Sequence, residues 1–327
     1  MGFLLPSPAH TFVCLAGQPF LIGFHPRCNS GHYSLGEAKM LLVLRWLRPS
    51  QLPTLFLLVM FTGLLGSVAR AADGMQYPLA AAVTPGGTIY VADRDLPGVW
   101  KFAENKWSIY FQGSKKFRTP LNAVRCLAID HEGKLLAGDS ATREIYRFGA
   151  DNQPVPLTEG NVGIPMSMAV AKDGTIFAGD IEIQRVVKIP AAGGKPEIIA
   201  EVTAPRGMAM DADGKLWVVS HGKNSVLRMS QDGKTTDVVT EGRPFQFQHH
   251  IVLGKEGEAY VADGYAKTIW KIKPGEKPEA FYAGDPLKNP VGLTWWNDVM
   301  LIVDPHQKSV YKRLPDGKLE VVGTAGN

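Results

Sequence analysis

Residues 87–93 read Gly-Thr-Ile-Tyr-Val-Ala-Asp, and the fold follows from five further segments with the same order of a turn residue, an apolar run and a closing polar residue. These segments are 133–139 (GKLLAGD), 174–180 (GTIFAGD), 214–220 (GKLWVVS), 257–263 (GEAYVAD) and 298–304 (DVMLIVD). Successive copies end 40 to 46 residues apart. Such regular spacing over six copies indicates an internal structural repeat.

Each copy divides into four short strands, as the fourth copy shows. Small apolar residues predict an inner strand over 207–212, and Asp213-Gly214 supplies a tight turn. Further strands are predicted over 215–220, 225–230 and 235–240. One such meander cannot bury both of its faces, whereas six packed radially can. The predicted fold class is therefore all-β: a six-bladed β-propeller of four-stranded antiparallel blades, whose ring closes by blade packing without strand exchange.

The N-terminal segment predicts export. Residues 40–71 begin with a basic stretch, continue with an apolar run over 55–68 and end in Ala69-Arg70-Ala71, an order typical of a secretory signal peptide cleaved after Ala71. The alternative is an uncleaved anchor, because 49–69 carries no charge. Residues 1–39 have no sustained apolar period and are interpreted as an unstructured upstream extension. In both cases the propeller, residues 72–327, is expected outside the cytoplasm, periplasmic or secreted.

The charge is unevenly distributed along the chain. The formal net charge is +4, and residues 1–71 account for all of it, because the remainder holds 30 basic and 30 acidic side chains. This balance gives no electrostatic case for nucleic-acid binding, and after signal cleavage no stable membrane insertion is expected. Cys126 is the one cysteine of the propeller. It is expected to pack as a small buried residue.

The repeats carry a family resemblance. Residues 204–234 and 248–276 resemble NHL repeats, and they are equally similar to blades of the SMP-30 and gluconolactonase-like superfamily. The resemblance covers residues 75–323. It implies the six-bladed fold but leaves the function open, because these propellers include lactonases, lyases and binding modules.

In such a propeller, the loops before the first strands and those between second and third strands surround the channel mouth on one face. Alignment of the repeats places six residues two positions before the predicted first strands: Leu79, Arg125, Met166, Arg206, His249 and Val291. The candidate ligand-binding residues on this face are Arg125, Arg206, His221, His249, His250, Tyr265 and His306. They predict binding of a small anionic ligand, a glycan or a protein partner.

The two arginines motivate the anionic ligand. Arg125 and Arg206 occupy a position that is apolar in three other blades, and a guanidinium is a planar fork suited to carboxylate or phosphate. The alternative is an ion pair with Glu182 or Asp139. For the aspartates that close five of the six second strands, repetition favours a structural role in the turn over catalysis. Two aromatic pairs are expected to fill the wedges between blades rather than to stack on sugars: Trp295 with Trp296, and Phe245 with Phe247.

The enzymatic alternative is a metal-dependent hydrolase of the lactonase type. The resemblance implies one divalent cation, held in part by a Glu of the first blade and by the Asp of a Pro-Asp-Gly sequence. This chain has Pro205-Arg206-Gly207 instead, and residues 77–84 contain no Glu. Both departures count against the lactonase mechanism.

A lyase is the other enzymatic alternative. Asp263-Gly264-Tyr265 and His249-His250 resemble parts of the zinc site of peptidyl-hydroxyglycine lyase, with His221 or His306 as further ligands. Adjacent histidines on an extended chain point to opposite sides, so only one of the pair serves easily. Catalytic residues and metal ligands are therefore left unassigned, and no cofactor is required unless the enzymatic alternative holds, in which case it is calcium or zinc.

Overall fold

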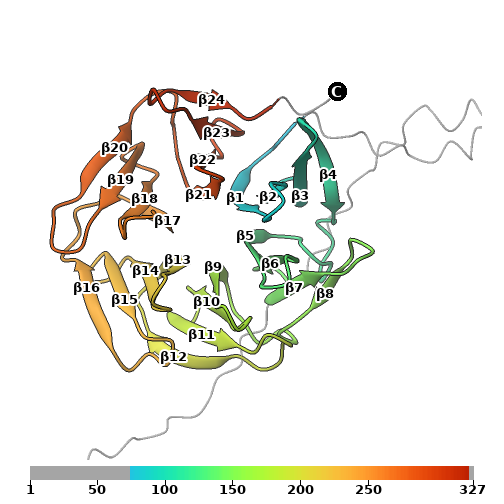
Figure 1. Cartoon of the computed structure of the whole chain (residues 1–327). Coiled ribbons are helices and arrows are strands. Elements are labelled where there is room, and N and C mark those ends of the chain that lie inside the picture. Colours follow the sequence, from blue (N-terminus) through green and yellow to red (C-terminus); the bar gives the residue numbers. More distant parts are fainter. Residues whose placement is uncertain (1–73, 324–327) are drawn as a thin grey trace, which may run out of the picture. The chain divides into compact units, whose positions relative to one another are not determined.

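The computed structural model describes residues 74–323, which form six four-stranded antiparallel sheets arranged as blades around a central axis (Figure 1). In every sheet the strands pair in sequence order. The described residues contain no helix, and hence none that could cross a membrane. The predicted six-bladed propeller is confirmed. The predicted extension over 1–39 and signal segment over 40–71 lie outside the described residues.

The strands fall into four concentric positions. The innermost strands are β1 (Pro78–Val83), β5 (Val124–Ile129), β9 (Pro165–Val170), β13 (Pro205–Met210), β17 (Gln248–Leu253) and β21 (Gly292–Trp296). The second strands are β2 (Ile89–Asp93), β6 (Leu135–Asp139), β10 (Ile176–Asp180), β14 (Leu216–Ser220), β18 (Ala259–Asp263) and β22 (Val299–Asp304). The third strands are β3 (Gly98–Ala103), β7 (Glu144–Phe148), β11 (Arg185–Ile189), β15 (Val226–Met229), β19 (Thr268–Ile272) and β23 (Ser309–Arg313). The outermost strands are β4 (Lys106–Gln112), β8 (Pro154–Pro156), β12 (Glu197–Glu201), β16 (Thr236–Thr240), β20 (Glu279–Ala283) and β24 (Leu319–Val321).

The core consists of six apolar clusters, one in each wedge between neighbouring blades. The second strands are the most deeply buried, and β6, β10, β14 and β18 are buried at every residue. Each lies inside its sheet with blades on both faces, which explains why these segments are near-continuous apolar runs. The outermost strands are partly exposed and carry the polar residues.

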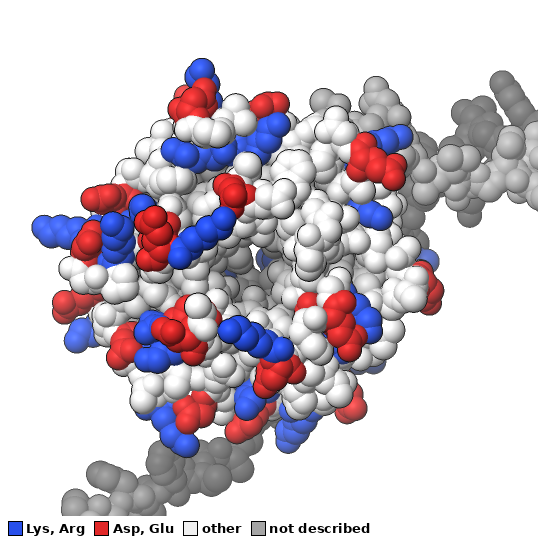
Figure 2. Space-filling view, viewed as in Figure 1, with Lys and Arg blue, Asp and Glu red and all other residues white. Residues whose placement is uncertain are grey.

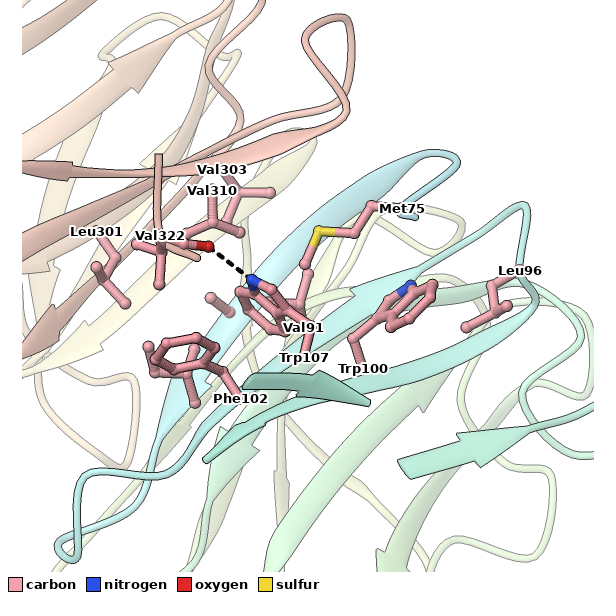
Figure 3. Packing of buried hydrophobic residues seen from close by; sticks show 12 residues of the cluster. Met75, Val91, Leu96, Trp100, Phe102, Trp107, Leu301, Val303, Val310 and Val322 are labelled. Atoms are coloured by element: carbon pink, nitrogen blue, oxygen red, sulfur yellow. Dashed lines mark hydrogen bonds between the residues drawn. The ribbon is translucent and has the colours of Figure 1, made fainter. Parts of the chain in front are cut away.

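The ring closes between blade 6 and blade 1 (Figure 3). Phe102 and Trp107 of blade 1 pack with Leu301 and Val303 of blade 6. The indole Nε1 of Trp107 donates a hydrogen bond to the carbonyl oxygen of Val322 at 2.6 Å. Closure therefore uses side-chain packing and cross-blade hydrogen bonds from tryptophan side chains, without strand exchange, as predicted.

Three of the four aromatic residues assigned to the wedges lie there. Trp295 donates from Nε1 to Leu253 O at 2.7 Å, and Trp296 donates to Gly87 O at 3.0 Å, so blade 6 is tied to both of its neighbours. Phe245 is buried in the wedge of blades 4 and 5. The fourth, Phe247, lies instead at the channel mouth.

The inner strand of blade 4 begins at Pro205, two residues earlier than predicted, and each of the first five inner strands starts with a β-bulge. In blade 4, Pro205 pairs with Ser220 and Gly207 pairs with Val219, which leaves Arg206 without a partner. The same irregularity carries Leu79 in β1, Arg125 in β5, Met166 in β9 and His249 with His250 in β17. A bulge breaks the two-residue period on which strand prediction depends, and it re-aims the side chain that it carries.

Candidate functional site at the channel mouth

Five buried aspartates fix the loops that lead into the mouth. Asp93, Asp139, Asp180, Asp263 and Asp304, here called the aspartate set, are fully buried at the ends of the second strands. Each accepts hydrogen bonds from its own turn and from the backbone just before the inner strand. Among those donors are the N–H groups of Tyr77 (2.8 Å), Ala123 (2.7 Å), Ile164 (3.0 Å), Phe247 (2.8 Å) and Asn289 (2.9 Å). The recurring aspartates are thus structural, as predicted, and they position residues at the mouth.

The bulge residues converge on one cavity of about 170 Å³ at the mouth of the channel, here called the mouth cavity. Figure 2 shows the ring hollowed at its centre, with acidic and basic side chains interspersed over the face in view. All six blades contribute to the lining, which consists of Tyr77, Leu79, Ala80, Arg94, Arg125, Met166, Arg206, His249, His250, Asn289 and Val291. The six positions aligned from the repeats all belong to it. No aspartate or glutamate of the described residues does.

Three guanidinium groups face the mouth cavity. Arg94 pairs with Asp95 at 3.3 Å and stacks over the ring of Tyr77 at 4.0 Å. Arg125 donates from Nε to Ser140 Oγ at 3.0 Å. Its pKa is lowered, first by burial and then by the positive charge of Arg94. The guanidiniums therefore disfavour one another's charge.

Arg206 is the least compensated of the three. Its guanidinium lies 4.7 Å from the ring centroid of Phe247, and its buried Nε has no hydrogen-bond partner among residues 74–323. Burial lowers its pKa, with a further contribution from the charge of Arg125. Neither Arg125 nor Arg206 forms an ion pair with a described acidic residue.

The ion pairs considered from the sequence are not formed. Glu182 pairs with Arg143 at 2.8 Å, and Asp139 is occupied by backbone N–H groups and by the hydroxyl of Thr142 at 2.6 Å. Both carboxylates are therefore committed elsewhere. That alternative is wrong for Arg125 and Arg206, because the nearby acids are already satisfied.

The two histidines of the cavity are neutral. Burial, followed by the charge of Arg206, lowers the pKa of His249 to about 3, and burial lowers the pKa of His250 to about 4. The Nδ1 of His250 and the Oδ1 of Asn289 are buried without a hydrogen-bond partner in the described part of the chain. Blades 5 and 6 therefore line the cavity with neutral polar groups, between Arg94 of blade 1 and Arg206 of blade 4.

Two glycines, Gly207 and Gly264, allow the side chain of Asn289 and the chain at His249 to pack closely at the mouth. A Cβ at position 264 would collide with Asn289 Oδ1 and lie 3.2 Å from His249 Nε2. A Cβ at position 207 would lie 2.5 Å from the carbonyl oxygen of His249. The Asp-Gly-Tyr sequence noted in the lyase comparison therefore has a packing role here.

Phe247 organises the rim. His221 and His249 contact it edge-on at 4.8 and 4.9 Å between ring centroids, and Tyr265 stacks on it at 4.6 Å. Tyr265 is 67% exposed. The Nε2 of His221 is hydrogen-bonded to Gln248 O at 2.7 Å. His221 and Tyr265 therefore border the cavity rather than line it.

His306 lies beside the cavity, with its ring 6.4 Å from that of Tyr77. Of the seven candidate residues, four line the cavity and three, His221, Tyr265 and His306, surround it. Sequence reasoning did not select Tyr77, Arg94 or Asn289 as candidates, although they line the cavity. A usable signal was present, because Tyr77, Phe247 and Asn289 occupy one repeat position that holds Ala or Ile in the other blades.

The donor set does not fit a divalent cation. No group of three or more His, Cys, Asp or Glu side chains in residues 74–323 is arranged to hold a metal ion. His221 is engaged by a backbone oxygen, and Arg206 replaces the carboxylate implied by the lactonase resemblance. Guanidiniums repel a cation, so the mouth cavity favours the opposite charge. Burial raises the pKa of Cys126 to about 12, which makes it an inert thiol.

Comparison with protein families identifies the chain. Residues 66–261, more than half of the chain, match the model described as the SMP-30/Gluconolactonase/LRE-like region. The chain belongs to this family. The resemblance noted from the repeats is confirmed. A comparison with curated proteins gave no match.

Solved structures of this family's fold are similar over most of the chain. A gluconolactonase from Xanthomonas campestris matches with a TM-score of 0.62 and 15% identity, over 76% of this chain and 87% of that one. Virginiamycin B lyase from Staphylococcus aureus matches with a TM-score of 0.59 and 15% identity, over 77% and 86%. A chain of the nidogen/laminin complex matches with a TM-score of 0.60 and 16% identity, over 75% and 93%. At these identities the similarity shows the fold alone.

Proposed function

We propose that this SMP-30/gluconolactonase-family propeller binds a small anionic ligand in its mouth cavity. The observation that carries the proposal is that Arg94, Arg125 and Arg206 face one cavity that no described acidic residue lines. Like charges that are half-buried and, for Arg125 and Arg206, without an ion-pair partner cost free energy, and an anion in the cavity reduces that cost. The ligand supplies the ion-pair partner that the arginines lack, because the carboxylates of the aspartate set already accept hydrogen bonds from the backbone.

The size of the cavity limits the ligand. At about 170 Å³, it is smaller than the roughly 300–1,000 Å³ of a typical small-molecule pocket. A single acidic group with a few attached atoms fills it, whereas a polysaccharide chain or protein segment reaches only the rim formed by Tyr265 and His306. A small anion is therefore preferred over the glycan and protein partners.

The test is calorimetric titration with malonate at constant ionic strength. We expect saturable binding to the unmodified protein and at least about tenfold weaker binding to Arg125→Met and Arg206→Met, because a charge-assisted hydrogen bond contributes about 1.5–3 kcal/mol. Arg143→Met removes the same charge from an exposed ion pair on the same face and is the matched control. Equal weakening by all three substitutions would mean that malonate senses only overall charge.

The proposal includes export, which rests on the sequence of residues 40–71. The mature protein is then expected to begin at Ala72. N-terminal sequencing of protein recovered from outside the cytoplasm checks this, and a chain that still begins at Met40 would support the uncleaved anchor.

A metal-dependent hydrolase or lyase is the alternative, and it is supported by the gluconolactonase and lyase among the similar structures. It separates from anion binding by its metal requirement. Melting the protein with EDTA, calcium or zinc distinguishes the two, because a ligand that binds the folded state raises the melting temperature. Anion binding predicts no shift, and a stoichiometric metal with a raised melting temperature would favour the enzyme.

A further inference from the structure

The charges at the mouth cavity can be counted. Arg94 and Lys115 share the single carboxylate of Asp95, both at 3.3 Å. Arg125 and Arg206 have no acidic partner in the described part of the chain, and both line the cavity. His249 and His250 are neutral there, because burial holds the pKa values of their rings at about 3 and about 4. Two guanidiniums are therefore left without an ion-pair partner, although the buried carboxylate of Asp139 offsets part of the charge of Arg125 from a distance.

The two uncompensated guanidiniums lie close enough to act on one ligand. Arg125 and Arg206 belong to blades 2 and 4, and only Met166 of blade 3 comes between their positions around the lining. The pKa of Arg206 is lowered first by burial and then by the positive charge of Arg125. The two guanidiniums are therefore close enough to repel each other. Two separate anions within a cavity of about 170 Å³ would repel each other, which favours one ligand over two.

We propose that the ligand is a compact dianion, with two negative charges on one small group, as in a phosphate monoester or a short dicarboxylate. This rests on the proposed anion-binding function and names the class of its ligand. One dianion neutralises Arg125 and Arg206 together. A monoanion leaves one buried guanidinium without a counter-charge.

The part of the lining that comes from blades 5 and 6 suits the remaining oxygens of such a group. A ring N–H of His249 and the side-chain NH2 of Asn289 can donate hydrogen bonds without adding charge. The ring N–H of neutral His250 is already donated to the backbone of Leu293, so His250 offers no donor. Leu79, Met166 and Val291 separate these polar groups, so the ligand oxygens are not surrounded by water. A dianion bound by two forks and neutral donors is fully compensated, and this cavity has the parts for it.

Sulfate and methanesulfonate provide the matched probes. They are similar in size and shape and differ by one negative charge. At constant ionic strength and pH 7, we expect calorimetry to give a dissociation constant for methanesulfonate at least about tenfold larger than that for sulfate, since an uncompensated buried charge costs more than about 1.4 kcal/mol. In Arg125→Met and Arg206→Met the ratio is expected to fall to within about threefold, and in Arg143→Met it is expected to persist.

Phosphate provides an independent check. Its second ionisation lies between pH 5.5 and 8, a range in which His249 and His250 keep their protonation state. Phosphate affinity is therefore expected to rise across this range while sulfate affinity stays constant. Malonate and methyl phosphate, both dianions at pH 8, then distinguish a dicarboxylate site from a phosphate site by which binds more tightly.

The outcomes separate this inference from the proposed function. Equal saturable binding of sulfate and methanesulfonate overturns the dianion and keeps anion binding. Binding of neither probe, nor of malonate, overturns both. A sulfate preference that survives in folded Arg125→Met and Arg206→Met overturns the location. If these variants do not melt cooperatively, Arg125→Lys and Arg206→Lys, which keep the charge, must retain the preference, and its loss in either contradicts the charge count.

Discussion

Two sets of charged side chains lie on the same face of this propeller, the fully buried aspartate set and the half-buried Arg125 and Arg206, and they differ in their hydrogen-bond and ion-pair partners. The aspartate set is fully buried, and each carboxylate accepts several N–H groups from its own blade. Arg125 and Arg206 lie nearby and have neither an ion-pair partner nor a full set of acceptors among residues 74–323. The aspartate set stabilises the fold. Arg125 and Arg206 remain available to bind a ligand.

The difference teaches how to interpret a repeat protein. A polar residue that recurs in five of six blades does the same structural task five times, here holding the loop that leads into the inner strand. A polar residue that breaks the repeat, such as Arg206 where Leu79 and Met166 stand in other blades, has no such task. Departures from the repeat mark the candidate site.

The largest expected effect is on the aspartate set. Asp263 accepts from the N–H groups of Gln246 and Phe247, both at 2.8 Å, and from Trp270 Nε1 at 3.3 Å. Asp263→Ala leaves these buried donors unpaired and is expected to lower the free energy of unfolding by about 3–5 kcal/mol, measured by urea denaturation. Ser220 occupies the same position in blade 4 with two hydrogen bonds. Ser220→Ala is expected to cost about 1 kcal/mol, and an equal cost at both positions would contradict the comparison.

The free energy of unfolding is expected to fall at acid pH because His250 is neutral in the folded protein. The pKa of His250 is about 4 in the folded protein and about 6.5 unfolded, so below pH 6.5 the unfolded chain binds more protons. Stability from this group is complete above pH 6.5 and is lost as the pH falls toward 4.

The matched variant is His250→Ser, which places in blade 5 the residue that blade 3 has at Ser167. Between pH 7 and pH 4.5, the unmodified protein is expected to lose about 2 kcal/mol more unfolding free energy than the variant. Carboxylates titrate alike in both proteins and cancel. Parallel losses would show that His250 is protonated in the folded state.

The smallest expected effect is on the arginines. Because Arg206 makes no ion pair among the described residues and is disfavoured by the charge of Arg125, Arg206→Met is expected to leave the free energy of unfolding unchanged or raise it by up to about 1 kcal/mol. Chemical denaturation without added anions checks this. A loss of about 2 kcal/mol or more would mean that Arg206 is a structural residue like the aspartates.

Much of the fold could be predicted from the chain because the repeat supplies six copies of one signal. The second strands were located to within two residues, since burial on both faces makes them continuous apolar runs. The starts of the inner strands were missed, since a β-bulge interrupts the alternation that reveals a strand.

The candidate site could be predicted in part. Aligning the repeats located Arg125, Arg206 and His249 at the mouth, because a repeat places equivalent residues at equivalent radii. The compensation of charge could not be predicted, because it depends on which acids are already engaged. Glu182 was expected on the same face, just after the second strand of blade 3, but it is paired with Arg143.

The central claim is that the mouth cavity holds an anion between its guanidiniums. The most direct measurement is anomalous diffraction from a crystal of the protein soaked in selenate, whose selenium marks the position of a bound oxyanion. The account predicts a selenium peak within hydrogen-bonding reach of both Arg125 and Arg206. Selenate bound only at exposed lysines, with the cavity holding water or a carboxylate of the chain itself, would contradict it.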